Sequence, residues 1–155
     1  PAVYFGENLT SEAVTPSLLR RCHAPYYRKR VAQLHAAGKY IFVHIDGTLR
    51  GLLPLLGETG VDCAQSVTPA PVGDVEIERL REVAGPEIIL WGGLPGVSFS
   101  PQHSEAALSG MAHSVIRNHL AGHKFIMGVS DQVPADGDIT RVRMITDIIE
   151  REAKY

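Results

Sequence analysis

Two residues near the end of a short apolar run have side chains that can bind a metal or exchange a proton. His44 and Asp46 stand two positions apart in the stretch His44-Ile45-Asp46-Gly47. Alternate residues of an extended backbone point to the same side, so the imidazole and the carboxylate are predicted to share a face. Such a pair can ligate a divalent metal or act as base and acid. The structural alternative is that His44 makes a hydrogen bond at the strand end and Asp46 caps the next helix.

A third candidate ligand follows the last apolar run of the chain. Asp131 lies in the loop Ser130-Asp131-Gln132-Val133-Pro134, which can approach the loop containing Asp46 in a barrel or a sheet. We therefore predict that His44, Asp46 and Asp131 are catalytic residues that together hold a metal, and that Gln132 contacts the substrate. The alternative for Asp131 is the start of a turn ahead of Pro134.

Other candidate substrate-binding residues follow two further strands. Gly92 and Gly93 allow a close approach of backbone to a ligand, and free N–H groups there can bind a carboxylate or phosphate. The alternative is a tight loop with no ligand. Glu7 and Asn8 end the first strand and are predicted to face the same cavity. The sequence contains neither the G-x-G-x-x-G pattern nor a Walker lysine, so these glycines are no nucleotide-binding motif.

These residues are positioned by a repeated alternation of short apolar runs and longer amphipathic stretches. This alternation predicts an α/β fold with a parallel sheet built from right-handed crossovers. The predicted strands are Ala2–Phe5, Tyr40–His44, Val61–Gln65, Glu87–Trp91 and Lys124–Gly128. The predicted helices are Pro16–Ala37, Leu49–Leu56, Val75–Ala84, Gln102–Ala121 and Ile139–Glu150.

Residues at the predicted boundaries agree with this alternation. Thr15, Asp74 and Asp138 are placed to cap helices, and glycines separate each helix from the next strand. The unusual residues gather in the loops after strands, where parallel α/β enzymes place their chemistry. One of these loops, Thr68–Asp74, contains two prolines and is predicted to shape a wall of the cavity.

Composition excludes several classes of function. The net charge of −2 gives no basis for binding nucleic acid or an anionic membrane surface, and no apolar run approaches the ~20 residues of a membrane span. Two cysteines, Cys22 and Cys63, are too few for a disulfide framework, so we expect a cytoplasmic protein. The six histidines other than His44 are predicted to be surface or capping residues: His23, His35, His103, His113, His119 and His123.

The segment Ala37–Gly47 resembles the strand with the pattern G…H-x-x-G in the uroporphyrinogen decarboxylase superfamily, which includes corrinoid-dependent methyltransferases. The resemblance spans nearly the whole chain. Its other parts follow in the order of that superfamily: Leu9–Pro25 before the histidine strand, then Gly60-Val61-Asp62, Gly73-Asp74, Gly92-Gly93 and the final strand ending near Asp131 and Pro134.

The resemblance implies a (β/α)8 barrel, of which residues 1–155 form a single domain with the C-terminal five βα units, strands four to eight. The first three units would be missing, along with the residues that bind porphyrinogen carboxylates in the decarboxylases. Five units of a barrel leave the inner strand faces bare, and an exposed apolar face needs a partner. That partner is either the missing N-terminal half or a second copy. The remaining alternative is a rearrangement into a flavodoxin-like open sheet.

The resemblance also bears on the metal. Superfamily methyltransferases have an H-x-C pattern and a later cysteine that hold a zinc ion, which activates a thiol. In this chain Asp46 and Asp131 stand at those cysteine positions, and Asp131 also replaces a histidine of the decarboxylases. A His44, Asp46 and Asp131 set suits Zn²⁺, Fe²⁺ or Mn²⁺ rather than a thiolate-rich zinc site. The carboxylates can also serve as acid and base without a metal.

The function implied first is a metal-dependent methyltransferase that acts on a small molecule with a corrinoid protein or another methyl carrier. The first alternative is a cofactor-free decarboxylase of a porphyrinogen-like polycarboxylate, which would belong to tetrapyrrole (porphyrin) biosynthesis. The second alternative is a non-catalytic half-barrel that self-associates.

Overall fold

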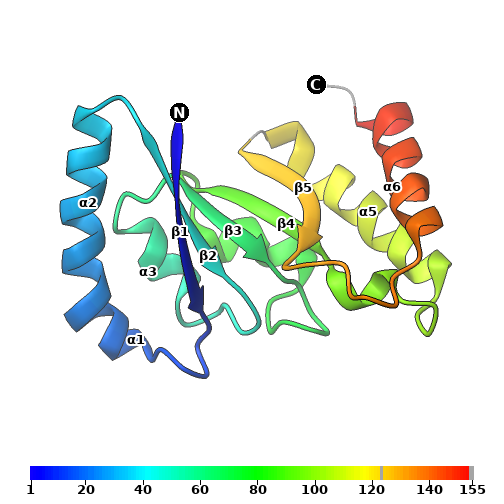
Figure 1. Cartoon of the computed structure of the whole chain (residues 1–155), viewed down its shortest axis with the longest axis horizontal. Coiled ribbons are helices and arrows are strands. Elements are labelled where there is room, and N and C mark those ends of the chain that lie inside the picture. The colour runs from blue at the N-terminus through cyan, green and yellow to red at the C-terminus, as the bar shows by residue number, and fades with distance from the viewer. Residues whose placement is uncertain (123, 154–155) are drawn as a thin grey trace.

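The strands form one parallel sheet whose order follows the chain. The computed structural model describes residues 1–122 and 124–153. Neighbouring strands pair in the order β1-β2-β3-β4-β5, and all four pairings are parallel. Figure 1 shows α2 beyond one edge of the sheet and α5 and α6 beyond the other. The strands are β1 Ala2–Leu9, β2 Tyr40–Ile45, β3 Cys63–Val67, β4 Ile89–Pro95 and β5 Phe125–Ser130.

This order confirms the predicted parallel α/β fold, with the topology of part of a barrel. A flavodoxin-like sheet has the order 2-1-3-4-5, so the rearrangement considered above is wrong. Sequential right-handed crossovers put every connecting helix on the same side of the sheet. The helices are α1 Pro16–Leu18, α2 Ala24–Ala36, α3 Leu53–Gly57, α4 Leu80–Ala84, α5 Glu105–His119 and α6 Ile139–Glu152.

The main core lies between the sheet and these helices. Alternate residues of β2, Ile41, Val43 and Ile45, are fully buried there, as is Leu90 of β4. A smaller core lies where α5 and α6 pack beyond β4 and β5. None of the helices in the described part of the chain is both long and apolar enough to cross a membrane.

The opposite face of the sheet carries large side chains that remain exposed among the described residues. Tyr4, Tyr40 and Ile126 are 55%, 61% and 40% exposed. Phe42 and Trp91 meet edge to face, with ring centroids 5.9 Å apart. The face left bare by five barrel units is therefore aromatic, and it leads to the ends of the strands where the candidate ligands lie.

Two helices differ from the prediction for reasons found in nearby residues. The first long helix is interrupted by a π-helical turn, Leu19–His23, just before Pro25, which has no N–H to continue the regular hydrogen bonding. Asp74 caps no helix that follows it. Its carboxylate accepts instead from the N–H groups of Leu49 and Arg50, at 2.6 and 3.2 Å. Thr15 and Asp138 cap α1 and α6 as predicted.

One histidine is wrongly predicted to be a surface or capping residue. His119 is only 4% exposed and stacks on Phe125 of β5, with ring centroids 4.8 Å apart. His35, by contrast, is a surface residue that pairs with Asp62 at 2.9 Å. His123 lies outside the described residues.

Candidate metal centre

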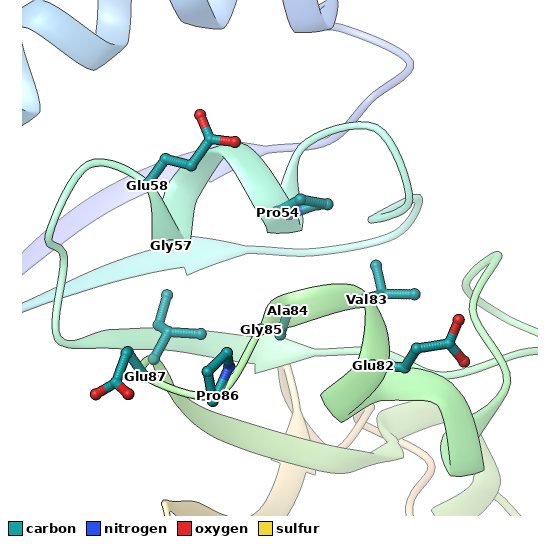
Figure 2. A pocket seen from close by; sticks show the side chains of 10 residues that line it. Pro54, Gly57, Glu58, Glu82, Val83, Ala84, Gly85, Pro86 and Glu87 are labelled. Atoms are coloured by element: carbon teal, nitrogen blue, oxygen red, sulfur yellow. The ribbon is translucent and has the colours of Figure 1, made fainter.

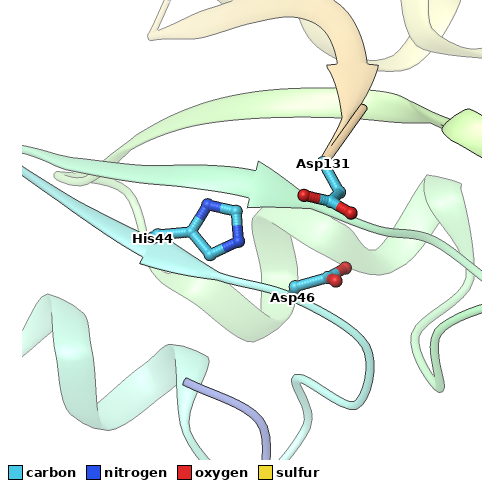
Figure 3. Close-up of side chains that lie close together, drawn as sticks. All are labelled: His44, Asp46 and Asp131. Carbon is cyan, nitrogen blue, oxygen red and sulfur yellow. The ribbon is translucent and has the colours of Figure 1, made fainter. Parts of the chain in front are cut away.

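The structure brings the three predicted ligands together at the carboxyl ends of β2 and β5. His44, Asp46 and Asp131 each offer one ligand atom, and these atoms all lie within 4.8 Å of one another. Figure 3 shows the His44 ring and the two carboxylates turned toward a common space. His44 and Asp46 are half-buried and Asp131 is exposed, so a solute can reach the group.

β3 holds His44 in place. The Nδ1 atom of His44 lies 2.6 Å from Oε1 of Gln65, and the two residues are paired across β2 and β3. The hydroxyl of Tyr4 on β1 donates to the same oxygen at 3.2 Å. These contacts leave Nε2 as the ring nitrogen on the side of the carboxylates, as Figure 3 shows.

Asp46 is oriented by two donors. Its Oδ1 accepts from the hydroxyl of Thr68 at 2.7 Å and from the N–H of Gly47 at 2.6 Å. Both bonds use the same oxygen, so the second oxygen remains available to a ligand. Asp46 does not cap the next helix, which was the alternative role for it. Helix α3 begins only at Leu53, and the backbone N–H that Asp46 accepts from is that of the adjacent Gly47.

Asp131 is held through its backbone in an unusual conformation. Its φ angle is +62°, and its N–H donates to the hydroxyl of Ser66, whose own φ is +77°. Left-handed conformations of residues other than glycine are uncommon and cluster at functional sites. The strand ends therefore hold Asp131 turned toward the site by a contact between β3 and β5.

A pocket opens beside the two carboxylates. It measures about 160 Å³, and Gln132, for which the sequence predicts a contact with the substrate, lies on its wall. Thr68 and Val72 of the proline-containing loop also line it, which agrees with the predicted role of that loop as a wall. The other lining residues are Asp46, Gly96, Val97, Ser130 and Asp131.

Gly92 and Gly93 lie inside β4 and are buried, not in a loop after it. The N–H of Gly93 donates to the hydroxyl of Ser130 at 3.1 Å, and that hydroxyl donates to the carbonyl of Val67 at 2.7 Å. A Cβ atom on Gly92 would lie 2.5 Å from the same carbonyl oxygen. The glycines therefore allow β3, β4 and β5 to approach one another, and the Gly93 N–H is already bonded.

Glu7 and Asn8 also lie within a strand, and neither lines the pocket. Glu7 is partly buried, as are Val3 and Phe5 at alternate positions of β1, and its Oε2 is buried with no hydrogen-bond partner among the described residues. Burial raises the pKa of this carboxyl, an effect that the charge of His23 partly offsets. Asn8 is exposed.

A larger pocket, of about 310 Å³, lies on the helical side of the sheet, between α3 and the turn after α4 (Figure 2). Of its three acidic residues, two are neutralised by neighbours. Glu82 pairs with Arg79 at 2.9 Å and Glu87 with Lys124 at 2.8 Å, and each partner lowers the pKa of its carboxyl. Because few polar groups converge there, this pocket is a weaker candidate for chemistry.

The donor set at the strand ends fits a divalent ion. Bonds of about 2.1 Å place two ligand atoms about 3.4 Å apart in a tetrahedral site, so these side chains, whose ligand atoms lie within 4.8 Å of one another, would have to close in around an ion. One imidazole and two carboxylates are ligands for Zn²⁺, Fe²⁺ or Mn²⁺.

The sequence alone did not predict that residues of β3 and of the loop after it support the candidate ligands. Gln65, Ser66 and Thr68 each support one of the three candidate ligands. The available signal was two adjacent polar residues, Gln65 and Ser66, closing an otherwise apolar strand.

Comparisons with known proteins agree with this geometry. The model of the family described as Uroporphyrinogen decarboxylase (URO-D) matches residues 2–152. No curated protein sequence is significantly similar to the chain. A solved structure titled "methyltransferase from Methanosarcina mazei" superposes with a TM-score of 0.74 at 14% identity, over 97% of this chain and 42% of that protein. The chain thus spans less than half the length of this structural relative, and it belongs to the uroporphyrinogen decarboxylase family.

Proposed function

We propose that this chain forms the ligand-bearing part of a metal-dependent methyltransferase. The observation that carries the proposal is the convergence of His44, Asp46 and Asp131, whose ligand atoms lie within 4.8 Å of one another beside a pocket. The structural relative titled a methyltransferase supports the same reaction class.

The three side chains would hold the ion, which when bound supplies Lewis-acid activation of a methyl acceptor. Asp46 and Asp131 bring negative charge, and His44 brings a neutral nitrogen. Gln132 and Thr68, on the pocket wall, are placed to orient a small substrate. A corrinoid protein or another methyl carrier would bring the methyl group to this mouth.

The bare face of the sheet fits the same proposal. Tyr4, Tyr40 and Ile126 are exposed on it, and the structural relative is more than twice as long as the matched region. We propose that the rest of the barrel covers this face and completes the wall of the substrate cavity. A second copy of the chain is the alternative cover.

The family description favours a second candidate, decarboxylation of a porphyrinogen-like polycarboxylate. Such a substrate carries several negative charges and needs cationic side chains around it. The described pocket is lined by two carboxylates and by no lysine, arginine or histidine. This candidate therefore ranks below methyl transfer.

Metal binding by the full-length protein tests the first proposal. We expect stoichiometric binding of Zn²⁺, Co²⁺ or Mn²⁺, and we expect Asp46→Ala and Asp131→Ala to weaken it by more than about 100-fold. Loss of a direct ligand should exceed the 10- to 100-fold cost of losing a supporting residue. Asp147→Ala is the matched control, because Asp147 is an exposed carboxylate on α6.

If the wild type and both site variants all bind no metal, the metal proposal is wrong. Turnover then separates the two reactions. Transfer of a methyl group from methylcobalamin to a thiol supports the methyltransferase, whereas loss of CO₂ from uroporphyrinogen supports the decarboxylase.

A further inference from the structure

We propose that Gln65 is a positioning residue that fixes the tautomer of His44, so that Nε2 presents its lone pair to Asp46 and Asp131. The inference deepens the proposed metal function and rests on it for the identity of the ligand. It concerns a side chain that is neither a candidate ligand nor a lining residue of the pocket.

The hydrogen bonds around one oxygen atom carry the inference. Oε1 of Gln65 lies 2.6 Å from Nδ1 of His44 and accepts from the Tyr4 hydroxyl at 3.2 Å. An amide oxygen has two lone pairs and only accepts, so both partners must be donors. Nδ1 therefore carries the ring proton. A neutral imidazole has one such proton, and Nε2 is left unprotonated.

The unprotonated nitrogen lies where a ligand is needed. Nε2 is on the side of Asp46 and Asp131, in the common space that Figure 3 shows. A ring with the opposite tautomer would direct an N–H into that space and could not ligate an ion. Gln65 thus decides whether His44 is a ligand or a hydrogen-bond donor.

The strand register makes the contact rigid. His44 and Gln65 are Cα partners in the parallel pairing of β2 and β3, so their side chains rise side by side from the same face. Both are half-buried, which limits competition from water. A residue that supports a metal-bound histidine in this way raises metal affinity by orienting the ring and setting its tautomer.

The amide of Gln65 can in principle turn over, which offers a direct test. With its NH₂ toward the ring, Nδ1 would accept and Nε2 would carry the proton. The Glu side chain in Gln65→Glu has only acceptor oxygens when ionised and permits only the first arrangement. The Leu side chain in Gln65→Leu is similar in shape but can neither accept a hydrogen bond from Nδ1 nor donate one to it. The ring is then left without a preferred tautomer.

The experiment uses the full-length protein labelled with ¹⁵N at histidine. Long-range ¹H–¹⁵N correlation spectra at alkaline pH identify the tautomer of His44 without metal, and its signals are assigned by their loss in His44→Gln. We expect an Nδ1–H tautomer in the wild type and in Gln65→Glu, and a mixture in Gln65→Leu. Titration with Zn²⁺ or Co²⁺ should show affinity 10- to 100-fold lower in Gln65→Leu, and undiminished in Gln65→Glu.

Tyr4→Phe is the control, because it removes the second donor and leaves the bond between Gln65 and His44. It should retain the wild-type tautomer. An Nε2–H tautomer in the wild type, or an unchanged Nδ1–H tautomer in Gln65→Leu, would overturn the inference. Wild-type protein that binds no metal while its tautomer still depends on Gln65 would refute the metal function alone and support the positioning role.

Discussion

Polar side chains lie at both ends of the strands, but they bond the backbone at the amino ends and face a shared space at the carboxyl ends. At the amino ends, near the start of β5, the guanidinium of Arg81 makes hydrogen bonds to the backbone. It donates to three carbonyl oxygens at 2.7 to 2.9 Å, those of Gly85, Ile88 and Lys124. At the carboxyl ends, the carboxylates of Asp46 and Asp131 face a shared space instead.

Two histidines make the same contrast. His119, at the amino end of β5, is buried, stacks on Phe125 and donates from Nε2 to the carbonyl of Ile77. His44 is half-buried, bonds through Nδ1 and leaves Nε2 facing two acids. The same residue type is a structural part in one region and a candidate ligand in the other.

The comparison of these two regions shows how a candidate binding site differs from polar groups that support the fold. Arg81 and His119 both bond backbone carbonyls, but Nδ1 of His119 is buried with no hydrogen-bond partner among the described residues, so incomplete bonding alone does not mark a site. At the carboxyl ends, β3 and the loop after it bond one atom of each candidate ligand through Gln65, Ser66 and Thr68, and another atom of each ligand faces the shared space. The carboxyl ends differ because the ligand atoms of three side chains converge within 4.8 Å of one another.

The largest effect that we expect is on stability, and it compares two glycines of positive φ, one at each end of the strands. Gly92 of β4 has φ +144°, and a Cβ would meet the Val67 backbone at 2.5 Å. Gly85 at the amino end has φ +82° and open space around it. We expect Gly92→Ala to lower the free energy of unfolding by about 3–5 kcal/mol, from strain plus overlap. Gly85→Ala should cost about 1–2 kcal/mol, from strain alone.

Urea unfolding of the full-length variants measures both effects. Equal losses at the two positions would contradict the close approach of β3 and β4 at Gly92. Metal affinity should change only for Gly92→Ala, because only that glycine lies beside the strand ends that hold the ligands.

A smaller effect is expected at Ser66, the residue that holds Asp131. Ser66→Ala removes the acceptor for the Asp131 N–H and should cost about 1–2 kcal/mol of stability. Freed from that contact, Asp131 should bind metal less well, which a Zn²⁺ titration measures. Ser66→Gly loses the same hydroxyl but relieves the φ of +77°, so its stability should stay closer to the wild type. Unaltered metal affinity in both variants would show that Ser66 does not position Asp131.

The sequence was sufficient to predict the alternation of strands and helices and the three residues that converge. Short apolar runs and the spacing of His44 and Asp46 are local signals, and parallel strands bring their carboxyl ends to one edge. The extent of β4 was not predictable in the same way. Gly92 and Gly93 are turn signals in a single sequence, and only the nearness of Val67 shows why glycine is needed there.

The supporting residues depend on contacts that no local pattern specifies. Gln65 matters because the register of β2 and β3 places it opposite His44, and a shift of one residue would turn it to the other face. His119 was predicted to be a surface or capping residue from its place in a helical stretch. Its burial comes from Phe125, which belongs to a strand six positions later.

The smallest predicted effect tests the structural histidine through pH. Burial lowers the pKa of His119 below its ordinary value of 6.5, and the charge of Arg81 adds to this, while the Ile77 carbonyl and Glu78 act in the opposite direction. The unfolded chain therefore binds a proton at a higher pH than the folded chain. Stability from neutral His119 is complete above pH 6.5 and is lost as pH falls below it, by at most about 1.4 kcal/mol per pH unit.

His119→Gln should remove this dependence, because a glutamine keeps a donor for the Ile77 carbonyl and does not titrate. The comparison is the slope of unfolding free energy against pH, from about pH 6.5 downward, in the full-length wild type and variant. His44→Gln is the matched control from the other end of the strands, and the slope attributed to His119 should persist in it. If the slope survives in His119→Gln instead, other groups cause it, and burial at the amino end does not keep this imidazole neutral.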